Sequence, residues 1–189
     1  MDNGRRGNRG RGAAAGNRRA LVAAAVEIFG EHGYDAPLSA VAKRAGVGQG
    51  SLYRHFPDRA DLALAVFDHN VTALEALVER PDVGLDQVLE LITDQIVASV
   101  AFVEVIAAGP PDARLTGVTD RVREVLAVAG GRAHDIRPPP AVGDLMLAIG
   151  MVAALVAKVP RGRRRETADG AWELLDRGLW SLSPEGGPA

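Results

Sequence analysis

Five polar side chains between residues 49 and 55 carry hydrogen-bonding groups of the kind that can read a DNA duplex. Glutamine can form two hydrogen bonds with adenine, and arginine can do the same with guanine, so Gln49 and Arg54 are candidate readers of base edges. The hydroxyls of Ser51 and Tyr53 and the ring N–H of His55 suit phosphate oxygens. These groups can act together only if a rigid element presents them to a groove.

Residues 37–59 predict such an element, because they form two short helices joined by a tight turn. The first helix has an apolar face that includes Val41. Gly46 suits the left-handed conformation that ends a helix, and Val47 then folds back onto the core. The second helix carries its polar residues around a buried Leu52. A helix, a short turn and a helix make the helix-turn-helix arrangement, whose second helix enters the major groove.

The segment LSAVAKRAGVGQGSLYRHFPDRADL resembles the DNA-binding signature of the TetR (tetracycline-repressor-like) transcriptional regulators. The resemblance covers about Arg18 to Leu64, and the remainder matches in helix pattern and length. It implies an all-α protein with an N-terminal three-helix helix-turn-helix DNA-binding domain at 17–64. A C-terminal helical ligand-binding and dimerisation domain would occupy 65–189. The implied function is sequence-specific DNA-binding transcriptional regulation in the cytoplasm, by a repressor that a small-molecule effector releases.

The same resemblance places nine residues at or near DNA. Lys43 can reach phosphate, and Arg59 matches a basic residue with which the family touches the DNA backbone. The chain departs from the family at Ala36-Pro37, where relatives tend to carry Thr or Ser, so one hydroxyl anchor is missing. The expected DNA-binding residues are Ser39, Lys43, Gln49, Gly50, Ser51, Tyr53, Arg54, His55 and Arg59.

Composition also favours helices packed on helices. The 189 residues are 47% hydrophobic and only 4% aromatic, with few alternating apolar runs. The formal net charge is -2, but arginines concentrate before residue 20. Residues 1–16 are too rich in Gly and Arg to bury surface, so we expect them to be disordered in isolation. They are either a solvated tail or an arm that follows the DNA backbone or minor groove.

Other functional classes find little support in the sequence. There are no cysteines, and no two of the 4 histidines have the i,i+4 spacing of a helical zinc site. We found no catalytic constellation and no nucleotide-binding glycine loop, so neither enzymatic activity nor a cofactor or metal is expected. The longest uncharged run, 145–157, is shorter than the ~20 residues needed to cross a bilayer.

Periodicity and breakers predict the remaining elements. Asn17 is expected to cap the first helix, and Asp58 the fourth. That fourth helix runs to Glu79 and should carry any signal between the domains. Further helices are expected at 17–32, 85–107, 112–129, 141–159 and 168–182, with a loop at 130–140 and a basic, exposed break at 160–166.

The second domain is expected to hold the effector and to form the dimer. A mostly aliphatic lining would favour a hydrophobic small molecule. The resemblance implies a homodimer through residues 142–159 and 168–182, which would read a palindromic operator in double-stranded DNA. The candidate effector-binding residues are the polar groups within apolar stretches, namely His69, Glu104, Arg121 and Asp144.

Two other interpretations remain open from the sequence. The chain could be a helical ligand-binding protein or enzyme that retains the helix-turn-helix as a scaffold. It could also be an architectural protein that binds DNA without sequence preference through its arginine-rich arm.

Overall fold

The computed structural model describes residues 4–98, 113–132 and 140–179, and these residues form helices without any strand. The all-α prediction is confirmed. The elements are α1 (Gly4–His32), α2 (Leu38–Arg44), α3 (Gln49–His55), α4 (Arg59–Val78), α5 (Leu85–Ala98), α7 (Ala113–Gly130), α8 (Val142–Val156), a 3-10 turn (Arg161–Arg163) and α9 (Arg164–Leu179).

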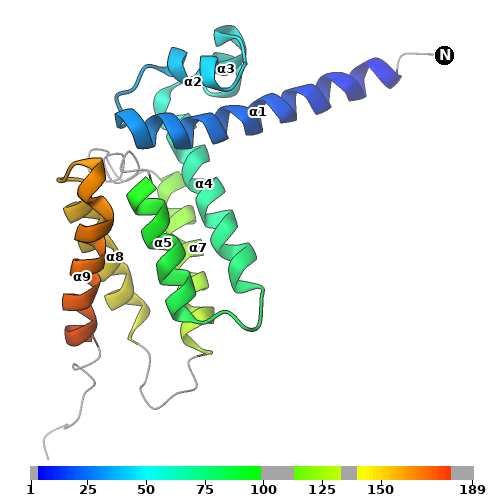
Figure 1. Ribbon diagram of the computed structural model, residues 1–189. Helices are drawn as coiled ribbons and strands as arrows, with labels where there is room; N and C mark the ends of the chain where they lie inside the picture. Colours follow the sequence, from blue (N-terminus) through cyan, green and yellow to red (C-terminus); the bar gives the residue numbers. More distant parts are fainter. Residues whose placement is uncertain (1–3, 99–112, 133–139, 180–189) are drawn as a thin grey trace, which may run out of the picture.

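The helices form two layers around two hydrophobic cores. Helix α1 lies across one end of the molecule with α2 and α3 packed on it, while α5, α7, α8 and α9 form a bundle below (Figure 1). Phe29, Leu52 and Phe56 lie in the upper core, and Leu74 and Leu126 in the lower one. Helix α4 contributes to both cores, with its buried residues up to Val66 in the upper core and those from Phe67 in the lower.

The turn between α2 and α3 has the predicted geometry. Gly46 has φ +65°, a left-handed conformation that other residues rarely adopt. The Val47 amide donates to the Ala42 carbonyl at 3.0 Å, and the Gly46 amide to Lys43 at 3.2 Å. These bonds satisfy carbonyls that the end of α2 leaves unpaired, so the sequence fixes the angle between the two helices locally.

The predicted cap of α4 is also confirmed, but that of α1 is wrong. The Asp61 amide donates to Asp58 Oδ1 at 2.8 Å at the start of α4. Asn17, in contrast, lies inside α1, which begins at Gly4. Alanines at positions 13–15 have the highest helix propensity, which favours continuation of the helix towards its N-terminus.

The two layers touch away from α4 as well, where α1, α5 and α9 meet. Gly30 is buried, and a Cβ there would collide with the Ala98 carbonyl oxygen. Arg164 Nη1 lies 3.4 Å from both the Gly30 and Val97 carbonyl oxygens. The predicted basic break at 160–166 is therefore helical from Arg164 onward, and Arg164 is half-buried rather than exposed.

Candidate nucleic-acid interface and ligand pocket

Helix α3 presents most of its predicted DNA-reading residues to solvent. Leu52 is its buried residue. Gln49, Gly50 and Arg54 are exposed, and 53% of the Tyr53 surface is accessible although the side chain is a large aromatic. An aromatic ring left outside the core on a seven-residue helix has a hydroxyl free to meet a polar partner.

Three polar residues of α3, the exposed Arg54 and the half-buried Ser51 and His55, make contacts within the protein. Arg54 Nε donates to the Gly50 carbonyl at 3.1 Å, and Nη2 lies 3.5 Å from Ser51 Oγ. Arg54 therefore lies back along its own helix and must swing outward to reach a base edge. His55 is half-buried, with its ring tilted by 49° against Phe56 at a centroid distance of 6.3 Å.

Helix α2 adds two predicted residues beside the start of α3. Ser39 and Lys43 are exposed. Both line a shallow hollow between α2 and α3, which Gln49 also borders. The structure thus brings a hydroxyl, an ammonium and a carboxamide to one concave edge, an arrangement that can meet a phosphate and an adjacent base together.

Two other arginines near this surface hold the fold. Arg44 pairs with Glu27 and, at 3.2 Å, with Glu31 Oε2, which ties α2 to α1. Arg59 Nη1 donates to the Tyr34 carbonyl and, at 2.6 Å, to the Ala36 carbonyl. Its guanidinium also sits 5.3 Å from the Tyr34 ring centroid. Arg59 therefore fixes the turn before α2, and its predicted contact with the DNA backbone does not follow from this geometry.

A cavity of about 390 Å³ lies within the lower bundle, between α4, α5, α7 and α8. Its size falls in the range of small-molecule sites. Among the residues that the structure describes, the polar lining residues are Asn70, Gln95 and Thr119, and none of the lining side chains is charged. The apolar lining consists of Phe67, Leu74, Ile92, Ile96, Val122, Met146, Ile149, Gly150, Ala153 and Ala154.

The four predicted effector-binding residues do not meet at this cavity. His69 and Asp144 are exposed, and neither lines it. Arg121 joins α7 to α4 instead: its Nε and Nη2 donate to Glu75 at 2.6 and 2.7 Å, and Nη1 to Asp68 at 2.5 Å. Glu104 lies outside the described residues. His69, Arg121 and Asp144 face solvent or a partner charge, as charged groups within apolar stretches commonly do.

The polar residues that do line the cavity were missed in the sequence. Asn70 follows Asp68 and His69, and Gln95 follows Thr93 and Asp94, so neither neutral amide stands out from its polar neighbours in the sequence. Gln95 Nε2 donates to the Asn70 carbonyl at 3.1 Å, which joins α5 to α4 and orients the Gln95 amide.

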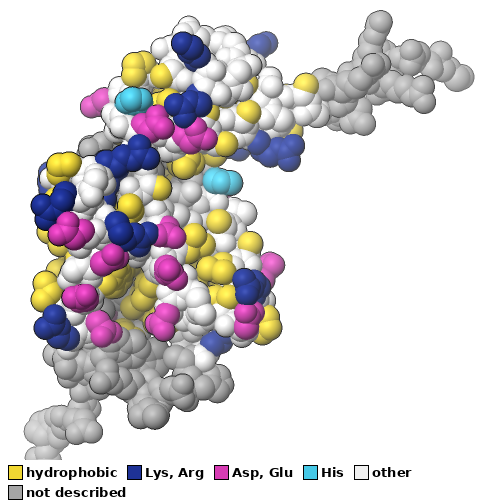
Figure 2. Space-filling view, viewed as in Figure 1, with side chains coloured by type: hydrophobic (Ala, Val, Ile, Leu, Met, Phe, Trp, Pro, Cys, Tyr) yellow, Lys and Arg dark blue, Asp and Glu magenta, His cyan; other side chains and the backbone are white. Residues whose placement is uncertain are grey.

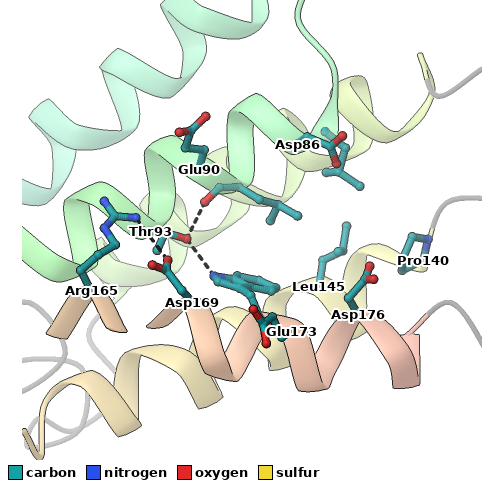
Figure 3. Close-up of a pocket in the computed structure, with 12 residues that line it drawn as sticks. Asp86, Glu90, Thr93, Pro140, Leu145, Arg165, Asp169, Glu173 and Asp176 are labelled. Carbon is teal, nitrogen blue, oxygen red and sulfur yellow. Dashed lines mark hydrogen bonds and ion pairs between the residues drawn. The ribbon is translucent and has the colours of Figure 1, made fainter. Parts of the chain in front are cut away.

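A second hollow, between α5 and α9, has the opposite chemistry. Acidic side chains gather over these two helices (Figure 2). Asp86, Glu90, Asp169, Glu173 and Asp176 line it together with Arg165 (Figure 3). Trp172 and three leucines contribute to its apolar lining. Trp172 Nε1 donates to the buried Thr93 Oγ1 at 2.8 Å. This contact ties α9 to α5.

The described part of the chain contains no cluster of three or more His, Asp or Glu side chains placed to hold a metal ion. None of its helices is both long and apolar enough to span a membrane.

The comparisons with known proteins agree with this architecture. The family described as "Bacterial regulatory proteins, tetR family" matches residues 21–66. The transcriptional activator FasR of Mycolicibacterium smegmatis is 33% identical over 172 residues, covering 76% of this chain and 75% of FasR. The transcriptional repressor LfrR of the same species is 29% identical over 182 residues, covering 90% of this chain and 94% of LfrR.

Two solved structures share the fold. A TetR regulator from Streptomyces coelicolor superposes with a TM-score of 0.63 at 27% identity, covering 86% of this chain and 98% of that chain. LfrR from Mycobacterium smegmatis, solved in complex with proflavine, superposes with a TM-score of 0.58 at 27% identity, covering 88% of this chain and 98% of the LfrR chain. The chain belongs to the TetR family of bacterial regulatory proteins. It is a DNA-binding transcriptional regulator.

Proposed function

We propose that this regulator binds a palindromic operator as a homodimer and that a small molecule in the α4–α5–α7–α8 cavity releases it. The observation that carries the proposal is that helix α4 contacts both the helix-turn-helix and the cavity. Helix α4 packs beneath the helix-turn-helix through residues up to Val66, and lines the cavity through Phe67, Asn70 and Leu74. A ligand that prefers one arrangement of α4 therefore changes the position of α3.

In the proposed interface, α3 lies in the major groove. Gln49 and Arg54 read base edges, and Tyr53 contacts phosphate together with Lys43 and Ser39. The half-buried Ser51 and His55 contact the backbone at the groove edge, and Gly50 allows close approach of the DNA. Exposure of Gln49, Tyr53 and Lys43 supports these roles.

Dimerisation is proposed through α8 and α9. Leu147, Met151 and Leu155 of α8 are 65%, 48% and 50% exposed, and Leu174 of α9 is 68% exposed. Large aliphatic side chains left in water on two adjacent helices favour burial against a second copy. Two copies would present two α3 helices to half-sites about one helical turn (~34 Å) apart.

Repression, rather than activation, is part of the proposal. LfrR, which aligns along most of this chain, is named a repressor, whereas FasR is named an activator. Regulation by binding, with no catalytic step, is the proposed role. Operator binding would place this role in the cytoplasm, where bacterial DNA lies.

The test is a gel-shift titration of the full chain on the DNA upstream of its own gene, at stated salt, against competitor DNA. We expect specific binding. Gln49→Ala should relax the preference at one base pair, by about 1–3 kcal/mol. Lys43→Ala should weaken every sequence alike and reduce the salt slope by about 1. Equal affinity for upstream and competitor DNA would refute the proposal, and would favour the arginine-rich end of α1 as a non-specific binder.

A further inference from the structure

The cavity between α4, α5, α7 and α8 differs from the acidic hollow in the charge of its described lining side chains. Every described side chain that lines the cavity is apolar or neutral, and most belong to aliphatic residues, Met or Phe. An ion placed there would lose its hydration without gaining an opposite charge, which is strongly unfavourable. The nearby ionic groups of α4 do not help, because Asp68 and Glu75 are already paired with Arg121.

Two of the three described polar residues on the cavity wall, Asn70 and Gln95, carry carboxamides, and the third is Thr119. Gln95 Nε2 donates to the main-chain carbonyl of Asn70, so the Gln95 amide is held in one orientation. Its Oε1 makes no hydrogen bond to any described residue and is an acceptor on the cavity wall. The Asn70 amide is half-buried beside it. A neutral hydroxyl or amide of a ligand can bond to such groups without carrying a charge into the cavity.

The mouth of the cavity is defined by small residues on α8. Gly150 and Ala154 are exposed although they line the cavity, and the other α8 lining residues are half-buried or buried. A Cβ at Gly150 would meet no protein atom within 4 Å. In the single chain, the cavity is therefore open at Gly150, on the face of α8 that also carries Leu147 and Met151.

We propose that the effector is a neutral, largely aliphatic molecule with one hydroxyl or amide group, which bonds to Gln95 and Asn70. The regulatory role of this ligand rests on the proposed function. Its binding to the cavity can be measured without DNA. The proposal excludes organic cations and carboxylates from this cavity.

The test uses three probes with the same alkyl chain: 1-octanol, octanoate and octylammonium, each titrated calorimetrically into the full chain at pH 7. We expect 1-octanol to bind at least about tenfold more tightly than either ion. Shortening the alcohol by one methylene should weaken binding about fourfold. Gln95→Leu should weaken the binding of 1-octanol but leave the dependence on chain length unchanged.

Gly150→Leu is the variant that tests the location, and Gly143→Leu is its control. Both glycines are exposed on α8 with nothing within 4 Å of an added Cβ, but Gly143 does not line the cavity. We expect Gly150→Leu to abolish alcohol binding and Gly143→Leu to retain it.

Three outcomes would overturn the proposal. These are equal or tighter binding of either ion, alcohol binding that survives Gly150→Leu, and no binding of any probe. Loss of operator binding in gel shifts would refute the proposed function instead. Release of the operator by a charged compound, but not by 1-octanol, would keep the function and reject this ligand class.

Discussion

At the scale of single residues, the DNA-facing surface contains both side chains that hold the fold and positions that are open to solvent. Gly50 is the clearest open position, because it lies exposed on α3 and an added Cβ would meet no protein atom within 4 Å. Arg59 is the clearest structural one, since its guanidinium is bonded to two carbonyls of the preceding turn. The two residues therefore predict opposite effects of substitution on stability.

Gly50→Ala should separate DNA binding from folding. Alanine is favoured over glycine inside a helix by up to about 1 kcal/mol, so the free energy of unfolding should rise slightly. DNA affinity should fall, because the added methyl group occupies the space through which the backbone approaches DNA. Thermal denaturation and gel shifts on one protein preparation measure both effects. Unchanged operator affinity would remove Gly50 from the proposed interface.

Arg59→Ala should lower both stability and DNA affinity. The carbonyls of Tyr34 and Ala36 would lose a charged donor, which costs about 1.5–3 kcal/mol. The turn before α2 would loosen, and every DNA sequence would bind more weakly. Lys43→Ala is the control, because Lys43 is exposed and should affect DNA binding without changing the denaturation midpoint. If the Arg59→Ala protein were as stable as wild type, Arg59 would not hold the turn, and its predicted contact with the DNA backbone would be favoured instead.

At the scale of elements, the junction of α1, α5 and α9 adds a second connection between the layers. The sequence predicted that α4 joins them and that any signal between them passes through it. Gly30 also allows α1 to approach α5, and Arg164 of α9 reaches carbonyls on both helices. Such a bridge links the proposed dimerisation helix directly to the DNA-binding layer.

Gly30→Ala tests this close approach. The added methyl group would collide with the Ala98 carbonyl oxygen, so α1 and α5 must separate. We expect a loss of about 1–3 kcal/mol in the free energy of unfolding, as for overpacked cores. Gly16→Ala on the same helix is the matched control, since its Cβ would meet nothing within 4 Å and should be neutral or stabilising. Equal effects of the two substitutions would show that the helices do not touch as described.

The ion-pair network between α4 and α7 makes a prediction about pH. Hydrogen bonds from Arg121 hold the pKa of the Glu75 carboxyl below its usual value. A carboxyl whose pKa is lowered by folding contributes stability that is fully present above its unfolded pKa and is lost as pH falls through its folded pKa. The carboxylates of Asp68 and Glu75, which both pair with Arg121, are about half-exposed. The network should therefore contribute about 1 kcal/mol to the free energy of unfolding at pH 7.

Arg121→Met should therefore lower the free energy of unfolding by about 1 kcal/mol at pH 7. The difference from wild type should shrink at acid pH, below the ordinary pKa of a glutamate, as Glu75 becomes protonated. Urea denaturation across this pH range measures it. Arg123→Met is the control, because Arg123 is exposed on the same helix. A difference that persisted at acid pH would mean that Arg121 acts through packing.

At the scale of the whole molecule, the sequence predicted what local chemistry determines. The turn at Gly46 and the cap at Asp58 follow from residues within a few positions of each other, and both are confirmed. The cavity was not predictable in detail, because it depends on which faces of four separate helices meet. Gln95 becomes a lining residue only when α5 packs on α4, and no pattern along the chain reports that contact.

The most direct test of the account is to select binding sites for the full chain from random duplex DNA. The account predicts enrichment of one two-fold symmetric sequence, with half-sites about 10 base pairs apart. Its affinity should exceed that for unselected DNA about a thousandfold or more. Protein carrying Gln49→Ala should enrich a sequence that is degenerate at one position of each half-site. Recovery of unenriched DNA, with binding that depends only on salt, would contradict the account.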